Sequence, residues 1–168
     1  QDLDRKNPRM RKKIVGISSI GDETDYINWI QEPQIRRAQL VGLKVSSHIG
    51  ERWHKGDYLT ALRRVKRELE LGIDRAAHLT ILGVSPEEMV ELTSVQRGAA
   101  AALQREIFRL LKKNGTHVET NPTSQRIFSP VHSDFEHHVS DTLLKEGISF
   151  SVHPDDASIL GTSPSEEF

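Results

Sequence analysis

Short apolar runs alternate along the chain with segments whose apolar residues recur at helical spacing. The apolar runs predict five strands, at residues 13–20, 43–47, 73–77, 116–120 and 148–152. The segments between them predict helices at 24–40, 57–71, 86–113 and 134–146. Strict alternation of strands and helices favours a parallel sheet with covering helices, so we expect an α/β fold.

Two of the predicted helices carry clear local signals. The segment 57–71 has an apolar stripe with basic residues opposite it, formed by Leu59, Leu62, Val65 and Leu69. Ser85 to Glu88 form a capping box with a proline in the first turn. One long helix is predicted after it, with a break near Gly98 left open. Pro33 is expected to break or kink the first helix.

Composition and charge narrow the range of functions. The 168 residues carry a net charge of −1, which gives no overall field for nucleic acid or membrane. No apolar run approaches the roughly 20 residues that cross a bilayer. The absence of cysteine excludes disulfides and thiolate zinc sites. A cytoplasmic protein with neither a membrane nor a nucleic-acid partner is therefore expected.

The start of the chain leaves two questions open. Residues 5–13 hold six basic residues, which could bind phosphates or form a solvated lead-in to the first strand. We favour the lead-in, because no aromatic residues interleave for base stacking. The chain opens with Gln1 rather than Met, which fits a cleavage product, a recombinant piece or a segment of a longer protein.

Polar residues capable of chemistry follow every expected strand. In parallel α/β folds the carboxyl ends of the strands meet at one rim, where ligands bind. One such residue means little, because lone histidines and Asp-Asp pairs are common in turns. Five successive strand ends of this kind predict a single site, made of Gly21, Asp22 and Glu23, then His48, Gly50 and Glu51, then His78, then 121–125, then Asp155 and Asp156.

The adjacent carboxylates Asp155 and Asp156 indicate a compensating group in that site. Like charges so close disfavour each other's ionisation, so a cation or a polar ligand is expected nearby. Two histidines and a carboxylate suit zinc, which binds imidazole nitrogen and carboxylate oxygen. Glu51 follows His48 by three residues and could serve as a proton donor in the same pocket.

Taken in order, these blocks resemble the adenosine deaminase branch of the zinc-dependent amidohydrolases. HIGE at 48–51 is similar to the family's His-Ala-Gly-Glu, and NPTSQ at 121–125 to its Cys-Pro-Thr-Ser-Asn. His78 stands where the family has Arg-Ile-Gly-His-Gly. IVGISSIGDE at 14–23 resembles Val-Val-Gly-Ile-Asp-Leu-Ala-Gly-Asp-Glu, and 143–158 resembles the helix, strand and Asp-Asp of the last barrel strand. Order and approximate spacing agree over residues 14–161.

The resemblance implies a (β/α)8 barrel and roles for the matched residues. His48 and Asp155 would bind zinc. Glu51 would protonate the purine ring nitrogen, and His78 would orient and deprotonate the attacking water. Zinc lowers the pKa of its bound water towards about 7, which makes hydroxide available at neutral pH.

Substrate contacts and the reaction follow from the same resemblance. Asp156 would hydrogen-bond the purine, and Gly21 would offer its backbone N–H to the base. The implied function is zinc-dependent hydrolytic deamination of adenosine or a related purine nucleoside or nucleotide, through metal-activated hydroxide and with release of ammonia.

The zinc ligands of the family's first strand have no counterpart in this chain. That strand carries a His-X-His pair, and no two histidines here are separated by one residue. A full barrel typically needs about 250 residues. Residues 1–168 are therefore expected to form a carboxy-terminal portion of the barrel, about the last five βα units. The missing amino-terminal segment would be its partner, and activity is expected only with that segment.

Two alternatives stay open at this point. The chain departs from the family at Ser18, at Ala157 and around His78, and its 79–115 segment is longer than usual. A catalytically degenerate scaffold for assembly or binding is therefore an alternative, including one within a bacterial phage-defence complex. The long segment could then serve contacts in a homo-oligomer. Another amidohydrolase reaction, such as deamination of AMP or a different base, is the second alternative.

Overall fold

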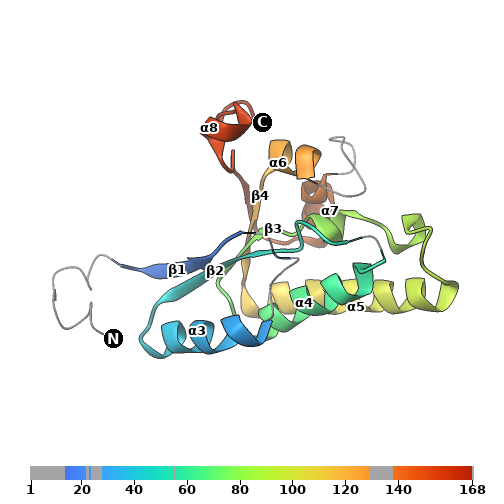
Figure 1. Cartoon of the computed structure of the whole chain (residues 1–168), viewed down its shortest axis with the longest axis horizontal. Coiled ribbons are helices and arrows are strands. Elements are labelled where there is room, and N and C mark those ends of the chain that lie inside the picture. Colours follow the sequence, from blue (N-terminus) through green and yellow to red (C-terminus); the bar gives the residue numbers. More distant parts are fainter. Residues whose placement is uncertain (1–13, 22, 24–27, 55, 129–137, 168) are drawn as a thin grey trace.

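Five parallel strands form one sheet in the order in which they occur along the chain. The computed structural model describes residues 14–21, 23, 28–54, 56–128 and 138–167. The strands are β1 (Gly16–Ser19), β2 (Lys44–Ile49), β3 (Arg75–His78), β4 (His117–Thr120) and β5 (Phe150–Val152). The predicted α/β fold is confirmed as a partial (β/α)8 barrel (Figure 1).

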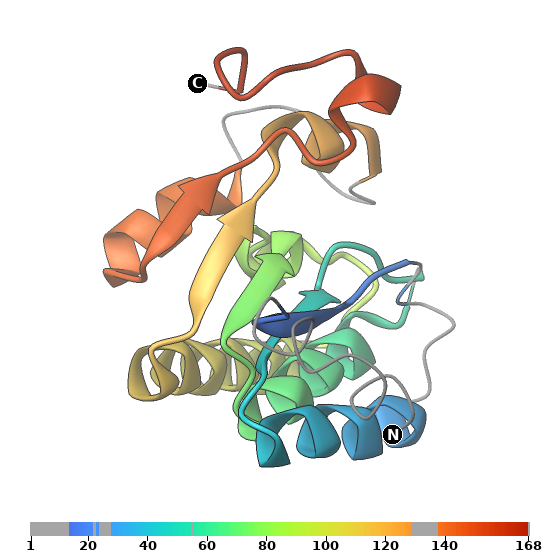
Figure 2. The same ribbon diagram turned by 90° about the vertical axis from the view of Figure 1, so that its left-hand side faces the viewer.

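The longest helices lie together on one face of this sheet. Figures 1 and 2 show α3 (Asn28–Leu40), α4 (Tyr58–Glu70) and α5 (Ser94–Asn114) side by side beneath the strands. Shorter helices α6 (Pro122–Phe128), α7 (Val139–Glu146) and α8 (Ala157–Leu160) accompany the last two strands. None of the helices in the described part of the chain has the length and apolar character needed to cross a bilayer.

The hydrophobic core fills the space between the sheet and the three long helices. Residues of β2 alternate between buried and more accessible positions, as expected for a strand with one covered face. The core includes Val45, Ala76 and Val118 from the strands and Leu62, Val65, Leu69, Ile107 and Leu111 from the helices. Each fully buried aliphatic side chain stabilises the fold by about 1.5–3 kcal/mol. The apolar stripe predicted for 57–71 is therefore the main contribution of α4 to the core.

The prediction of one long helix after Ser85 is wrong. The capping box at Ser85 starts only a short 3₁₀ turn, η3 (Pro86–Glu88), and a second capping box at Thr93 starts α5. Gly98 lies inside α5 without breaking it. Pro33 likewise lies inside α3, which continues to Leu40. Residues 24–27 and 134–137, which the sequence assigned to helix starts, lie outside the described residues.

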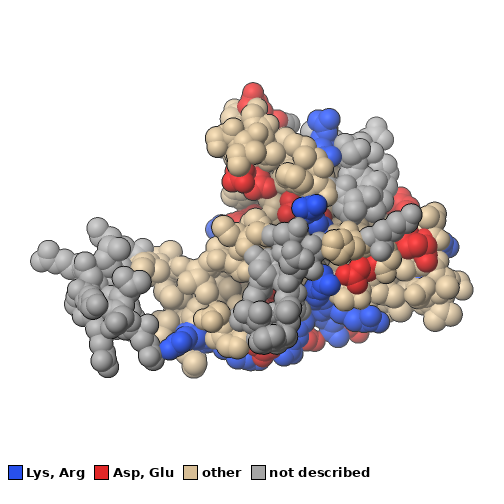
Figure 3. Space-filling model, viewed as in Figure 1, with Lys and Arg blue, Asp and Glu red and all other residues tan. Residues whose placement is uncertain are grey.

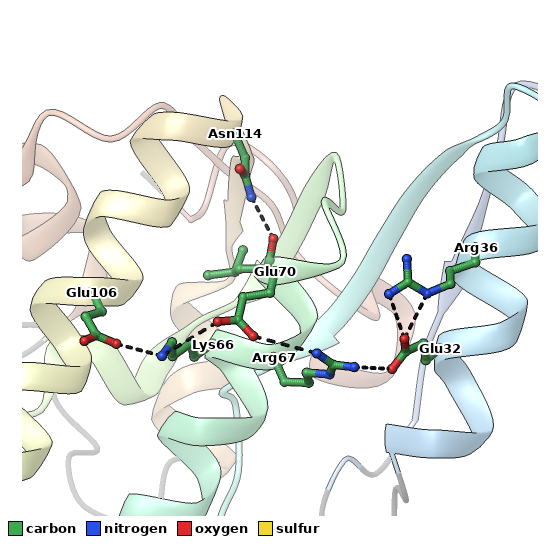
Figure 4. Close-up of polar contacts among 8 residues, drawn as sticks. Glu32, Arg36, Lys66, Arg67, Glu70, Glu106 and Asn114 are labelled. Atoms are coloured by element: carbon green, nitrogen blue, oxygen red, sulfur yellow. Dashed lines mark hydrogen bonds and ion pairs between the residues drawn. The ribbon is translucent and has the colours of Figure 1, made fainter.

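Charged side chains link the long helices across their exposed surface. Glu32 of α3 accepts hydrogen bonds from Arg36 and from Arg67 of α4, at 2.9 and 2.6 Å. Lys66 of α4 lies 2.8 Å from Glu106 of α5 (Figure 4). Figure 3 shows Lys and Arg side chains gathered along this side of the molecule, with acidic groups among them. Such exposed pairs contribute little to stability, so packing in the core fixes these helices.

In the described part of the chain the sheet is not closed, and its strand order leaves two edges. Among the described residues, β1 and β5 each pair with one strand only. Next to and within β1, the side chains of Val15, Ile17 and Ile20 are exposed. The inner face is polar, because Arg75 pairs with Glu119 and the His117 ring is hydrogen-bonded to serines of the β5 segment. The sheet therefore has the edges of an unclosed barrel.

Candidate metal centre and catalytic site

A polar cleft of about 370 Å³ opens at the carboxyl ends of the strands. Five of the six residues predicted for the site line it, and the sixth, His78, is buried directly beneath them. The carboxyl ends of the parallel strands therefore bring these predicted residues together at one cleft. The lining residues are Ile20, Gly21, His48, Glu51, Arg52, Phe128, Asp155 and Asp156.

The two histidines come from neighbouring strands and contact each other. His48 lies opposite Ala77 in the β2–β3 register, and His78 is the last residue of β3. Their rings meet edge to face, with centroids 4.6 Å apart and planes at 76°. Both imidazoles therefore present nitrogen atoms to the same small volume.

The backbone at His78 is in the left-handed region, which departs from a regular strand. His78 and Leu79 have φ angles of 72° and 50°, although neither is glycine. In the β2–β3 register His78 lies opposite Ile49, which is a core residue. The ring of His78 nevertheless contacts the polar site. Left-handed residues cost of order 1–3 kcal/mol each and persist where the surrounding structure fixes them. The bonds Leu79 N–H to Ile49 O and Ile81 N–H to Gly50 O, at 3.0 and 2.8 Å, fix this turn.

The carboxylate of Glu51 lies beside the buried histidine. Glu51 Oε1 is 3.5 Å from His78 Nδ1 and accepts a hydrogen bond from Ser124 Oγ at 3.1 Å. One ligand atom each from His48, Glu51 and His78 lies within 4.8 Å of the others. A single cation could therefore reach all three side chains.

The Asp155–Asp156 pair separates into two environments. Asp155 Oδ2 lies 3.9 Å from His78 Nε2, and its φ of 55° is also left-handed. Asp156 is exposed and occupies the N-cap position of α8, where its main-chain oxygen accepts from the Leu160 N–H. The first aspartate therefore belongs with the histidines, and the second faces the open cleft.

Burial sets the protonation of these groups. It lowers the pKa of His48 and of His78, and the neighbouring His78 lowers that of His48 further. It raises the pKa of Glu51, an effect that the hydrogen bond from Ser124 opposes. At neutral pH both imidazoles are therefore uncharged, as a metal ligand must be, while Glu51 is shifted towards its protonated form.

The donor atoms fit a zinc ion. Imidazole nitrogens and carboxylate oxygens are ordinary zinc ligands in proteins. His48 and Asp155, the ligands that the resemblance implies, line the same cleft. Glu51 and His78 are also close enough to His48 to be considered as ligands. The roles of the individual residues therefore stay predictions at this point.

Several residues near the site were given no individual task in the sequence-based prediction. Asn121 Nδ2 lies 3.1 Å from His78 Nδ1, and the Glu23 carboxylate binds the turn that carries Glu51. Both stood at expected strand ends, which was the available signal. Arg52 and Phe128 were missed as lining residues, because no local pattern marks a side chain that reaches a cleft from a helix or loop.

Comparison with known proteins identifies the fold. No protein-family model matches the sequence, and no curated protein matches it either. The apo N6-methyl-AMP deaminase from Arabidopsis thaliana has a TM-score of 0.66 and 20% identity, over 91% of this chain and 37% of that chain. Arabidopsis ADAL complexed with GMP has a TM-score of 0.65 and 19% identity, over 91% and 37%. Arabidopsis ADAL complexed with IMP has a TM-score of 0.66 and 19% identity, over 91% and 36%.

The chain spans little more than a third of the length of these structures. At this level of identity the likeness concerns the fold, and it agrees with an open five-stranded sheet rather than a closed barrel. The resemblance seen in the sequence is therefore confirmed at the level of the fold: the chain is folded as part of a barrel of the adenosine and AMP deaminase type.

Proposed function

We propose that this chain is the carboxy-terminal, proton- and metal-handling part of a zinc-dependent purine aminohydrolase. One observation carries the proposal: His48, Glu51, His78 and Asp155, from three separate strand ends, come together at one cleft. The reaction would replace the amino group of adenosine, or of a related nucleoside or nucleotide, by the oxygen of water and release ammonia. A cytoplasmic location belongs to this proposal.

Each side chain would have a separate task. His48 and Asp155 would hold the metal, and a bound zinc would lower the pKa of a water to about 7. Glu51 would give its proton to the purine ring nitrogen, since burial favours its protonated form. His78 would hold the attacking water through Nε2, because Nδ1 is occupied by Asn121.

The open cleft supports a purine as substrate. Gly21 and Asp156 lie on its lining, where a backbone N–H and a carboxylate would contact the base. The cleft volume of about 370 Å³ falls in the range of small-molecule sites. Two of the structures with similar folds were crystallised with purine nucleotides, IMP and GMP, which favours a nucleotide over a free base.

The open sheet supports the need for a further segment. Both edge strands have unpaired sides in the described part of the chain, and β1 is flanked by exposed apolar residues. A segment that adds the first strands of the barrel would cover both. We propose that the amino-terminal part of the barrel is this partner, with a second copy of the chain as the alternative occupant.

Metal content and ammonia release test the function. The chain would be combined with the amino-terminal barrel segment, loaded with zinc, and assayed on adenosine and on AMP. Glu51→Gln should lower kcat by about 10²–10⁴-fold, the usual contribution of a positioned acid. The matched control is Glu91→Gln, at an exposed carboxylate that does not line the cleft.

The same measurement separates enzyme from scaffold. A degenerate scaffold would bind no zinc at His48 and would show equal, background ammonia release for the unchanged protein and for Glu51→Gln. An enzyme with a different substrate would bind zinc, and its Glu51→Gln variant would bind as much zinc as the unchanged protein. Absence of zinc from the completed assembly would reject the proposal.

A further inference from the structure

The carboxylate of Glu23 accepts three consecutive backbone N–H groups. Glu23 stands two residues after Gly21, beyond the end of β1, and reaches across to the turn that follows β2. Its Oε2 accepts from Gly50 N–H at 2.7 Å, and its Oε1 accepts from Glu51 and Arg52 N–H at 2.5 and 2.7 Å. The middle residue of the three is Glu51, the proposed proton donor.

The same turn is held from its other side by β3 and η2 (Thr80–Gly83). The Gly50 carbonyl accepts the Ile81 N–H at 2.8 Å. Gly50 has a φ of +68°, and a Cβ at this position would lie 2.8 Å from Ile81 Cγ2. The turn therefore has no room to move towards Ile81, and the three hydrogen bonds to Glu23 hold its backbone N–H groups.

A carboxyl group suits this contact better than an amide does. Two oxygens with four lone pairs can serve three N–H groups, whereas the single oxygen of a glutamine leaves its amide N–H₂ facing one of them. Hydrogen bonds from N–H groups to an ionised acceptor are also the strong ones. Burial raises the pKa of Glu23 to about 7, with a smaller contribution from the neighbouring Glu51, and the three backbone hydrogen bonds oppose that rise.

We propose that Glu23 is the positioning residue of Glu51, holding the β2 turn so that the Glu51 carboxyl stays beside His78. The proposal rests on the function proposed above for Glu51. Glu23 is not itself a catalytic residue, because its carboxylate is occupied by the turn. A displacement of a reacting group by about 1 Å can cost about 100-fold in rate, which is the size of effect expected when the clamp is lost.

Amide hydrogen exchange of the whole chain tests the clamp without any activity. In Glu23→Gln the amides of Gly50, Glu51 and Arg52 should exchange at least about tenfold faster, because one amide then faces the glutamine N–H₂ and the others keep only an amide oxygen as acceptor. Amides of the α4 core should be unchanged, and so should all amides in the control Glu91→Gln. Equal exchange at the three turn amides would overturn the proposal.

Steady-state kinetics of the completed, zinc-loaded assembly test the positioning role. Per zinc-loaded molecule, Glu23→Gln should lower kcat by about 100-fold with KM within a few fold of the unchanged protein. Glu23→Asp, which keeps both oxygens on a shorter stem, should recover part of kcat. A purely structural role would lower the melting temperature but leave kcat per loaded molecule unchanged, and that result would reject positioning.

The proposed function and the inference about Glu23 can be rejected independently of each other. If the unchanged assembly releases no ammonia from any purine, the proposed function is lost, while faster exchange at the three amides still supports the clamp. If the assembly is active and Glu23→Gln retains its kcat, the inference about Glu23 is lost and the function stands. Should Glu23→Gln not fold, Glu23→Asp is compared with the unchanged chain by the same exchange measurement.

Discussion

A buried hydrogen bond joins Asn121 to His78, at the ends of the neighbouring strands β4 and β3. In it, Asn121 Nδ2 lies 3.1 Å from His78 Nδ1. An amide nitrogen can only donate, so His78 Nδ1 must accept. The ring hydrogen of the neutral imidazole is then on Nε2, the nitrogen that lies 3.9 Å from Asp155 Oδ2. The Asn121 side chain therefore determines which ring nitrogen of His78 carries the hydrogen.

Asn121→Asp should reverse the tautomer of His78. A carboxylate in this place accepts rather than donates, so Nδ1 would take the ring hydrogen and Nε2 would become a bare acceptor. The nitrogen chemical shifts of the His78 ring, read from long-range ¹⁵N–¹H correlation spectra, report this directly. His54, which is exposed, should keep its shifts and serves as the internal control. Unchanged His78 shifts in Asn121→Asp would contradict the assignment.

Substitutions at the proposed ligands should separate the two candidate ligand sets. His48→Ala and Asp155→Asn should each weaken zinc binding by more than about 100-fold, because loss of even an outer-shell partner costs about 10- to 100-fold. Glu51→Gln should leave zinc affinity nearly unchanged, since Glu51 is proposed to carry a proton and not the metal. Chelator competition on the completed assembly measures all three.

The control for the metal measurement is His54→Ala. His54 is exposed and follows the turn after β2 that carries Glu51. It should bind zinc as the unchanged protein does. A large loss of zinc in Glu51→Gln, with little loss in Asp155→Asn, would instead assign the metal to His48, Glu51 and His78, the three residues whose ligand atoms lie within 4.8 Å of one another.

The order of elements and the location of the site could be predicted from local patterns. Period-two and helical spacing, together with turn residues such as Gly72 and Gly147, depend on neighbours in the sequence, so the five strands were found. Once the strands are parallel, their carboxyl ends must meet, so His48 and Asp155 fall at one cleft. These two steps needed no knowledge of packing.

Features that depend on tertiary contacts could not be predicted. The capping boxes at Ser85 and Thr93 look alike in sequence, and packing decided that only the second starts a long helix. The left-handed backbone of His78 is stabilised by bonds to the β2 turn, which no local signal announces. The three-amide contact of Glu23 likewise joins residues 27 to 29 positions apart.

A buried carboxyl under β2 links stability to pH. Glu68 of α4 is 5% exposed, and Ser47 Oγ donates to its Oε2 at 2.5 Å. Burial raises the pKa of Glu68 to about 7 from its ordinary value of 4.5, although the Ser47 bond opposes this. The folded state therefore holds the proton more tightly than the unfolded state does. Stability from this group is complete below pH 4.5 and falls as pH rises towards 7.

Glu68→Gln should remove this pH dependence, because the amide keeps the size and polarity of the protonated acid but cannot ionise. The shift corresponds to about 3 kcal/mol in the free energy of unfolding of the unchanged chain, lost between pH 4.5 and about 7. Urea unfolding at several pH values measures it. The Glu91→Gln control should follow the unchanged chain, since Glu91 is exposed. Parallel curves for the unchanged chain and Glu68→Gln would show that Glu68 ionises at its ordinary pH in the folded state.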